Sequence, residues 1–535
     1  MNANTLPTFG DIVSGVRLLA RLPPILRRPL TSEEAHAILH DHLENRERNF
    51  LTLARDGIYG YPRSPYRRLL ESAGCAYGDL ERLVRQNGLE SALYSLYRQG
   101  VYLTADEYKG RRSVVRGNMT FRISPADLHN PSLRSDMFGR TSGSRGPGTL
   151  VPMEFAAHRN YSADALLEME ARGGRDWLHA IWLMPGSGAL IRVMRYNFCG
   201  TRLARWFFLV EPRTEGLHPR YYRSVQALRL AALLAGVRLP RPEFMGLHDP
   251  LPITRWMGEV VRAGKTPHLQ AYASCVVRIC QTALKHGIDL KGARFTMGGE
   301  PTTSARLAIV RQVGAEALVR YATADASGLG LGCMAPQVPD EVHFLHDRCA
   351  IAQPGENSTA ELPPDALLLT TVRPKARLIL LNVSLGDQAA VSQRRCECPL
   401  ERLGWTRHLH TIRSFEKLTV GGASFLDTDL IRVLEEALPA RFGGGPTDYQ
   451  LLDEESADGK ARVRLLVHPR LGPMDPAQVR QAFLDAIGAG TGVERVMMLV
   501  WRDAGLPIIE RTEPSATAGG KILHVHLERG GDRTE

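Results

Sequence analysis

The sequence is poor in cysteine and has neither a long apolar run nor a block of like charges. Its eight cysteines in 535 residues are too few for the disulfide frameworks of small secreted domains. No stretch of eighteen apolar residues occurs, so no transmembrane helix is expected. No secretory signal peptide is recognised either. Together these absences predict a protein of the reducing, cytoplasmic compartment.

The positive charge of the chain is spread along its length. The net charge is +10 and the isoelectric point about 9.3, yet the arginines never form a run of five, and the recognised nucleic-acid signatures are missing. A generally basic surface explains the excess, so nucleic acid is not an expected partner. A basic site for an anionic small molecule is compatible with the same charge.

One segment near the start mixes apolar and basic residues. Residues 9–30 have the pattern of a basic amphipathic helix until Pro23 and Pro24 end it. Such a helix either packs on its own domain or makes a weak contact with a membrane surface or a partner.

Alternating strand-like and helical runs predict an α/β fold beyond residue 140. Residues 1–130 are expected to form a largely helical lead-in. Strand-like runs then occur at 178–184, 189–195 and 205–210, helical runs at 222–236 and 269–286, and a second strand-rich stretch at 365–393.

The character of the chain changes again near Arg413, where a compact tail of roughly 120 residues begins. This tail has helical runs at 427–438 and 476–487 and strand-like runs at 462–467 and 495–501. We expect a large N-terminal α/β domain of several subdomains over residues 1–412. A small, mobile α+β domain is expected over residues 413–535.

A glycine-rich loop interleaves hydroxyl side chains with glycines and one arginine. Glycine lets backbone N–H groups turn towards an anion, and hydroxyls and arginine add donors for phosphate oxygens. The loop lacks the Gly-Lys-Ser/Thr ending of a Walker loop. Its residues are Thr141, Ser142, Gly143, Ser144, Arg145, Gly146, Pro147, Gly148 and Thr149. A second glycine-rich run at 328–332 lacks the context of a dinucleotide-binding fingerprint.

Further short motifs follow the loop in a fixed order. They are Gly298, Gly299, Glu300 and Pro301; Tyr321 to Asp325; Leu385 to Asp387; Arg413 near the boundary; and Gly519, Gly520 and Lys521 close to the end. Each motif alone is of modest specificity, whereas the series in this order and spacing is far more specific.

The series resembles the adenylate-forming superfamily of acyl-CoA synthetases, peptide-synthetase adenylation domains and luciferases. It is most similar to the phenylacetate–CoA ligase branch, with kinship to acyl-protein synthetases, over residues 45 to 525 or so. The resemblance implies a large α/β region hinged to a small C-terminal domain. It also implies ATP-dependent activation of an aryl or fatty acid to an acyl-adenylate, with release of pyrophosphate. Transfer to a thiol, coenzyme A in the first instance, would follow.

The resemblance implies a role for each motif. The loop from Thr141 to Gly146 would hold the β- and γ-phosphates, and Lys521 would bridge the acid and the α-phosphate. Asp325 would be linked to Mg²⁺. The adenosine contacts would come from Gly298, Gly299, Glu300 and Pro301 beside the adenine, Tyr321 stacked on it, and Asp387 and Arg413 at the ribose.

The sequence also departs from the family pattern. Arg145 and Gly148 replace a threonine and a proline in the loop. Ala324 stands where a threonine touches the AMP phosphate, Asp325 is shorter than the usual glutamate, and Phe415 and Glu416 occupy the position of a hinge aspartate. These departures leave open a protein or carrier thiol, or an amine, as acceptor, and also a degenerate nucleotide-binding scaffold.

Cysteine and histidine spacing suggests a structural zinc site. Cys396 and Cys398 form a close thiol pair, and Cys333 and His343 lie upstream. The phenylacetate–CoA ligase branch has a similar arrangement, including an aspartate four places after the histidine, here Asp347. Three thiolates and one imidazole would complete a tetrahedral shell. His346 and Cys349 are rival ligands, and two ordinary free cysteines are the alternative.

Overall fold

The computed structural model describes most of the chain. The described residues are 9–140, 150–209, 220–246, 249–323, 325–359, 361–415, 418–420, 423–425, 427–455, 461–488, 501–502, 505–516 and 521–528. The predicted phosphate loop at 141–149, together with Ala324, Glu416 and the strand predicted at 495–501 up to residue 500, lies outside these residues.

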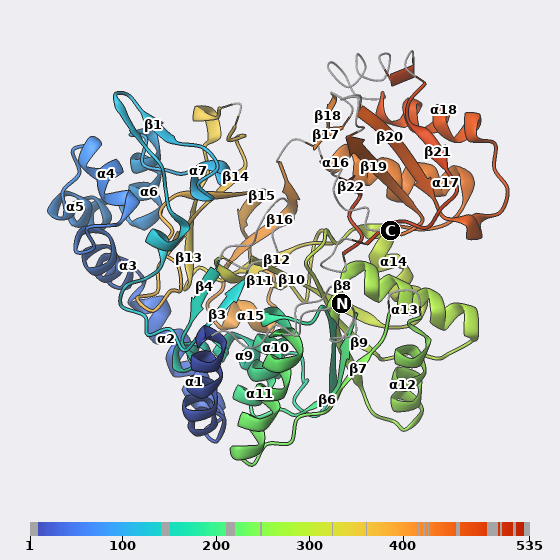
Figure 1. Cartoon of the computed structure of the whole chain (residues 1–535), viewed down its shortest axis with the longest axis horizontal. Coiled ribbons are helices and arrows are strands. Elements are labelled where there is room, and N and C mark those ends of the chain that lie inside the picture. Colours follow the sequence, from blue (N-terminus) through green and yellow to red (C-terminus); the bar gives the residue numbers. More distant parts are fainter. Residues whose placement is uncertain are drawn as a thin grey trace.

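A twelve-stranded sheet forms the centre of the large region (Figure 1). Its order is β13-β14-β15-β16-β12-β11-β10-β9-β8-β5-β6-β7. The half from β10 to β7 is parallel and the other half antiparallel. The parallel strands are β5 (Leu178–Leu183), β6 (Leu203–Phe208), β7 (Pro242–Phe244), β8 (Pro267–Tyr272), β9 (Arg294–Gly298) and β10 (Glu316–Thr323). The remaining strands are β11 (Ser327–Gly332), β12 (Val342–Phe344), β13 (Cys349–Ala352), β14 (Ala366–Thr371), β15 (Val383–Gln393) and β16 (Arg407–Ser414).

Helices cover both faces of the parallel half, as buried crossovers between parallel strands require. One face carries α8 (Phe155–Tyr161), α9 (Ala163–Ala171), α10 (Ser187–Phe198) and α11 (Arg220–Leu234); the other carries α12 (Leu251–Arg262), α13 (Ala273–His286) and α14 (Ser304–Gln312). The predicted α/β class is confirmed.

Helices and two short hairpins precede this sheet. The helices are α1 (Phe9–Leu26), α2 (Ser32–Glu44), α3 (Arg46–Ala54), α4 (Pro65–Ser72), α5 (Tyr77–Asn87), α6 (Leu89–Arg98) and α7 (Ala105–Tyr108). The hairpins are β1 (Val114–Arg116) with β2 (Met119–Phe121), and β3 (Met137–Arg140) with β4 (Leu150–Met153). Helices α3 to α6 share a core with β13, β14 and β15. Among the described helices, none combines the length and apolar character needed to cross a bilayer.

The first helix continues through its two prolines, so the prediction that they end it is wrong. Helix α1 runs to Leu26 with Pro23 and Pro24 inside it. Both prolines fall in its last turn, where each removes one intrahelical N–H bond but no following turn is left to be disrupted. Its apolar face, with Leu18, Leu22 and Leu26 almost fully buried, packs in the core of its own region.

The run at 189–195 is a helix, and the strand predicted there is wrong. It lies inside α10, where Ala189, Leu190, Val193 and Met194 are buried at helical spacing. A short apolar run does not distinguish a strand from a buried helix by its sequence alone. The helical conformation matters because it aligns Arg192 and Arg195 one turn apart.

A separate four-stranded sheet follows in the C-terminal region, in the order β21-β20-β19-β22. Its strands are β19 (Tyr449–Glu455), β20 (Ala461–Val467), β21 (Ile508–Glu510) and β22 (Val525–Glu528), and it shares a core with α16 (Asp427–Arg432), α17 (Leu438–Phe442) and α18 (Pro476–Ile487). The predicted small α+β unit is thus present, beside α13 and α14 (Figure 1). The preceding strand β16 still belongs to the large sheet as far as Ser414, and a boundary at residue 413 stays a prediction.

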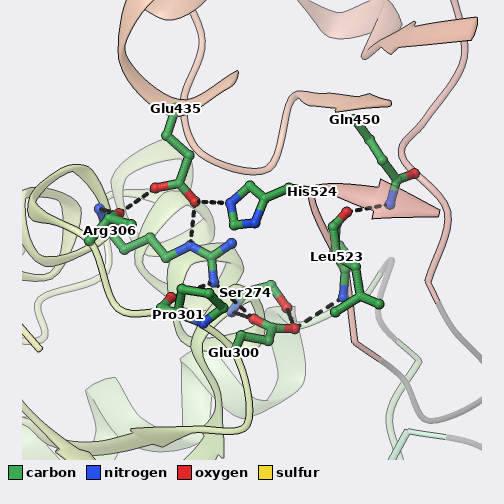
Figure 2. A network of polar contacts seen from close by, with 10 residues as sticks. Ser274, Glu300, Pro301, Arg306, Glu435, Gln450, Leu523 and His524 are labelled. Carbon is green, nitrogen blue, oxygen red and sulfur yellow. Dashed lines mark hydrogen bonds and ion pairs between the residues drawn. The ribbon is translucent and has the colours of Figure 1, made fainter. Parts of the chain in front are cut away.

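A buried polar network joins the region of the twelve-stranded sheet to the C-terminal region (Figure 2). Arg306 of α14 is 1% exposed and pairs with Glu300 at 3.0 Å and with Glu435 at 2.8 Å. Glu435 also accepts from Thr303 and from His524 Nε2, the latter at 2.7 Å. Burial alone would raise the pKa of Glu435, but the charge of Arg306 and the His524 hydrogen bond lower it to about 2. The contact is therefore ionic and fully enclosed.

Arg306→Met is expected to lower the free energy of unfolding by about 3–5 kcal/mol, because it leaves two buried carboxylates without their cation. Chemical denaturation measures this. Arg205→Met is the control, since its pair with Glu243 is largely exposed and contributes about 0–1 kcal/mol. Equal losses of unfolding free energy in the two variants would show that the buried network stabilises the fold no more than the Arg205–Glu243 pair does.

Candidate functional site

The candidate site lies at the carboxyl ends of the parallel strands, the edge where open α/β sheets bind ligands. Strand register places Gly298 at the end of β9 between Tyr272 of β8 and Arg320 of β10. A Cβ on Gly298 would lie 2.8 Å from the Arg320 carbonyl oxygen. Gly299 has a φ of +78°, and a Cβ there would lie 2.9 Å from the Tyr272 ring. Only glycine fits this turn, which leaves room for a side chain above it.

Lys521 occupies the space above the glycine turn. Its Cε lies 3.3 Å from the Cβ position of Gly299, and its Nζ lies 5.7 Å from the Tyr272 ring centroid. Burial lowers the pKa of Lys521; the charge of Glu300 opposes this change and that of Arg192 adds to it. The structure therefore brings together two motifs that lie more than two hundred residues apart.

Glu300 anchors the segment that carries Lys521. Its carboxylate accepts from the Ile522 backbone N–H at 3.0 Å and from the Ser274 N–H and hydroxyl at 2.6 and 2.8 Å. Arg306 supplies a fourth donor at 3.0 Å. The carboxylate is thus engaged by the protein itself, while the glycine pair beside it forms the surface under Lys521. Sequence reasoning assigned Glu300 to the adenine side and missed this anchoring contact.

Tyr321 and Asp387 form a second pair at the same edge. The Tyr321 hydroxyl donates to the Asp387 carboxylate at 2.8 Å. Burial and the charge of Asp387 raise the pKa of Tyr321 well above its ordinary value. The charge of Asp387 also reaches Lys521, whose pKa it raises. Glycine turn, lysine, tyrosine and aspartate therefore belong to one site.

The other predicted site residues have partners outside this group. Asp325 is 8% exposed and accepts from the Tyr108 hydroxyl at 3.0 Å. Arg413 donates to Asp340 at 2.7 Å, and its strand register sets it opposite Gln388. The predicted roles of Asp325 and Arg413 stay predictions. Arg145 and the hydroxyl and glycine residues of its loop lie outside the described residues.

The predicted zinc ligands converge. His343 Nε2 lies 3.1 Å from the Cys398 sulfur and 3.6 Å from the Cys396 sulfur. These separations are close to the roughly 3.6 Å expected between sulfur and nitrogen ligands of one tetrahedral zinc ion. Cys333 belongs to the same cluster, and hydrogen bonding between its thiol and Cys398 lowers the pKa of Cys398.

The surroundings orient the donors of this cluster. His343 Nδ1 lies 2.6 Å from the Trp405 carbonyl; since a carbonyl only accepts, the proton is on Nδ1 and Nε2 faces the sulfurs with a lone pair. Glu397 has a φ of +57°, and this turn brings both neighbouring thiols to the same side. The Glu401 carboxylate accepts from the backbone N–H groups of Cys396 and Glu397 at 2.8 and 2.5 Å.

His408 is a further donor that sequence reasoning missed. Its ligand atom lies within 4.8 Å of those of Cys333, His343 and Cys396. Burial lowers the pKa of His408 to about 4. Neither of its ring nitrogens has a hydrogen-bond partner among the described residues. The spacing rules of sequence reasoning do not reach it, because it comes from the adjoining strand β16.

A small cavity lies under α9 and α10, on the sheet face opposite α13. Its volume is about 40 Å³, enough for two or three water-sized groups. Trp177, Tyr196 and His179 line it together with a set of charged and polar side chains: Glu168, Arg172, Arg195, His268, Gln270, Thr296 and Arg320. Sequence patterns provided no signal for this cavity, because Arg195 was assigned to a strand and the other lining residues come from distant segments.

A hydrogen-bond chain fixes the protonation of two histidines at this cavity. Successive contacts of 2.9 Å join Arg172, Thr296, His268, His179 and the Gly174 carbonyl. The carbonyl only accepts, so His179 carries its proton on Nε2 and its Nδ1 accepts from His268. His268 Nε2 in turn accepts from the Thr296 hydroxyl. At most one of the two rings can be cationic in this arrangement, and burial lowers the pKa of both, which keeps both neutral near pH 7.

Comparison with known proteins finds similarity only at the level of solved structures. Neither a protein-family model nor a curated protein sequence matches the chain. A 2-hydroxyisobutyryl-CoA ligase with 2-HIB-AMP and CoA is 14% identical, covers 94% of this chain and 92% of its own, and has a TM-score of 0.43. An anthranilate CoA ligase with anthranoyl-AMP is 12% identical, with coverages of 72% and 65% and a TM-score of 0.41.

A third similar structure is the acyl-CoA synthetase (AMP-forming)/AMP-acid ligase II-like protein of Dyadobacter fermentans. It is 14% identical, covers 72% of this chain and 87% of its own, and has a TM-score of 0.29. These structures come from the class of protein that the sequence motifs resemble, the adenylate-forming ligases.

The neutral histidine pair predicts a loss of stability in acid. Burial lowers the pKa of His179 to about 4 and also lowers that of His268. Between about pH 6.5 and 4 the unfolded chain therefore binds protons that the folded chain does not, so the free energy of unfolding falls as the pH falls. Urea denaturation at pH 7 and 4.5 should show a smaller fall in His179→Gln than in the wild type.

Exposed His286 provides the control, since His286→Gln removes a histidine at the end of α13 without removing a buried one. An identical pH dependence in wild type and His179→Gln would contradict the assignment of two neutral imidazoles.

Proposed function

We propose that this protein activates a carboxylic acid with ATP, releasing pyrophosphate, and transfers the acyl group from the acyl-adenylate to a thiol, coenzyme A in the first instance. The observation that carries the proposal is the meeting of Lys521 with the Gly298–Gly299 turn at the carboxyl end of β9. The order of the motifs along the chain, from the glycine-rich loop to Lys521, supports it independently.

Lys521 is the residue to which we assign the main catalytic role. Negative charge builds on the α-phosphate as the acid attacks it, and a cation held in a low-dielectric site stabilises that charge. Lys521 is held for this by Glu300, which binds the backbone of its neighbour Ile522 at 3.0 Å. A lysine fixed in this way needs little reorganisation during the reaction.

Binding of the nucleotide is assigned to the residues around Lys521. The Tyr321 and Asp387 pair would contact the adenosine, with the Asp387 carboxylate accepting from ribose hydroxyls. The glycine turn beside Glu300 and Pro301 would face the adenine. The loop from Thr141 to Gly146, with Arg145, would hold the β- and γ-phosphates. Arg413 would lie beside the ribose.

Mg²⁺ fits the carboxylate of Asp325, which the motif from Tyr321 to Asp325 supplies. Mg²⁺ in nucleotide sites keeps several waters and needs only one or two protein carboxylates besides the substrate phosphates. Asp325, whose present hydrogen-bond donor is Tyr108, is the carboxylate assigned to it. When bound, the ion would neutralise phosphate charge. Orienting the substrates and excluding protons from the site remain tasks of the chain's own residues.

Zinc is the metal we assign to the Cys333, His343, Cys396 and Cys398 cluster. Thiolate and imidazole donors at tetrahedral separations favour Zn²⁺ over hard cations. A complete protein shell is typical of a structural ion, which here would tie the turn around Cys396 to β11 and β12. His408 is a further candidate donor, with its ligand atom within 4.8 Å of those of Cys333, His343 and Cys396.

Lys521→Ala is expected to lower acid-dependent ATP–pyrophosphate exchange about 100- to 1000-fold, the usual effect of removing one group that stabilises transition-state charge. The assay uses a panel of aryl and fatty acids. Exposed Lys285 is the matched control, and Lys285→Ala should retain exchange. Nucleotide binding without exchange on any acid would instead favour a nucleotide-binding scaffold.

The same purified protein serves to identify the acceptor of the acyl group. Consumption of coenzyme A after exchange is established supports the thioester product. Exchange without coenzyme A turnover points to a carrier thiol or an amine.

The purified protein is expected to contain one zinc ion per chain, measured by elemental mass spectrometry. Cys396→Ser combined with Cys398→Ser should abolish the zinc and lower the melting temperature, because the ion stabilises only the folded chain. Cys280→Ser, which alters a buried cysteine of α13, should leave the zinc content unchanged. Zinc that persists in the double variant would place the ion elsewhere.

A further inference from the structure

Two partly exposed arginines of α10 have no ion-pair partner among the described residues. Arg195 lines the cavity under α9 and α10. Among the described residues no hydrogen bond or ion pair reaches its guanidinium, and its Nε is buried and unsatisfied. Arg192, one helical turn earlier, donates only to the Gly188 carbonyl of its own helix, at 3.0 Å. Both side chains are partly exposed, and neither has a carboxylate within ion-pair distance among the described residues.

The carboxylates near the cavity are already occupied by other arginines. Asp164 pairs with Arg320 at 2.9 Å and with Arg348 at 2.8 Å. Glu168 pairs with Arg320 at 2.9 Å and with Arg172 at 3.5 Å. Around these two anions the described residues therefore supply three partnered arginines, and the two α10 arginines are in excess of them.

The excess positive charge is unfavourable in the unliganded protein. Burial and the charge of Arg320 lower the pKa of Arg195 to about 9. Burial also lowers the pKa of Arg192. The charge of Asp164 partly offsets that of Arg195, but no carboxylate lies within ion-pair distance of either arginine among the described residues, so the site is suited to an anion that enters from outside.

This positive region is continuous with the candidate active site. The charge of Arg192 shifts the pKa values of both Tyr272 and Lys521. Arg320, at the cavity wall, lies beside Gly298 in the sheet register. Arg320 and Arg195 both line the cavity, Arg192 lies one turn before Arg195 on α10, and the cavity therefore adjoins the glycine turn under Lys521.

Resting on the proposed function, we propose that the acid activated here is a dicarboxylic acid, whose second carboxylate binds Arg195 and Arg192 while the first reacts beside Lys521. A guanidinium donates two parallel N–H bonds to a carboxylate. The cavity of about 40 Å³ has room for a group of that size. An apolar monocarboxylic acid would leave Arg195 without a carboxylate partner.

The test compares acids of matched skeleton: adipate with hexanoate, and terephthalate with 4-methylbenzoate. Dissociation constants are measured by calorimetry in the presence of AMP, and KM and kcat by ATP–pyrophosphate exchange. The wild type is expected to bind the dicarboxylate of at least one pair about 10- to 100-fold more tightly than its monocarboxylate, the usual effect of a charge-assisted contact.

Arg195→Gln should remove this preference by raising KM for the dicarboxylate far more than it changes kcat. Arg195→Lys should restore part of it, because the charge returns without the planar fork. Arg202→Gln, which removes an exposed arginine near the start of β6, is the control and should keep the full preference. Thermal melting verifies that each variant is folded.

The outcomes separate this inference from the function on which it rests. Equal binding of both members of every pair, binding of neither, or a preference that survives in folded Arg195→Gln overturns the inference. ATP–pyrophosphate exchange with monocarboxylic acids alone would contradict the dicarboxylic acid as substrate and would still support the ligase activity. If dicarboxylates bind in an Arg195-dependent way but no acid supports ATP–pyrophosphate exchange, the anion site is supported and the ligase activity is contradicted.

Discussion

The buried ion pairs of Arg306 are the constraint on which the candidate site depends. Arg306 joins Glu300 of the large region to Glu435 of the C-terminal region, and all three side chains are almost wholly enclosed. Glu300 is the shared element, because the same carboxylate holds Ile522 and hence the neighbouring Lys521. A buried ion pair contributes little net stability compared with an apolar contact, since desolvation offsets the attraction. Its effect here is to specify one position for the lysine.

The second organised region of the molecule, the Cys and His cluster, follows a different physical rule. Its donors come from the residue after β11, from β12 and from the turn before α15 (Pro399–Arg402), so no single element could hold them together by itself. Hydrogen bonds to Trp405 and Glu401 orient the imidazole and the two-cysteine turn before any ion is considered. Arg394 donates to the Cys333 sulfur at 3.6 Å, which reduces the repulsion among neighbouring thiolates. A metal ion would enter a site whose donors already point inward.

Part of this arrangement could be predicted from the sequence, for identifiable reasons. The Gly298–Gly299 pair and the Cys396–Cys398 pair are local signals, because positive φ and thiol spacing need specific residue types. Alternating runs indicated the parallel sheet. The partners of Glu300, Arg413 and His408 could not be found, since each contact joins residues far apart in the chain. Helix α10 was misassigned because its apolar run, interrupted only by Arg192 and Arg195, is short, and a short run does not distinguish a strand from a buried helix.

The polarity of the sheet itself argues that the region under α10 exists for a ligand. Along β8 and β9, the residues that face α13, such as Leu269, Phe295 and Met297, are apolar and fully buried. The alternate residues, such as His268 and Thr296, form a buried polar face on the other side. A core built only for stability would be apolar on both faces, as parallel sheets covered by helices usually are. Keeping histidines neutral and arginines desolvated on one face costs stability. Glu168 and Asp164 offset part of that cost by pairing with Arg172 and Arg320, whereas Arg195 has no such partner among the described residues, and the face ends at the glycine turn below Lys521.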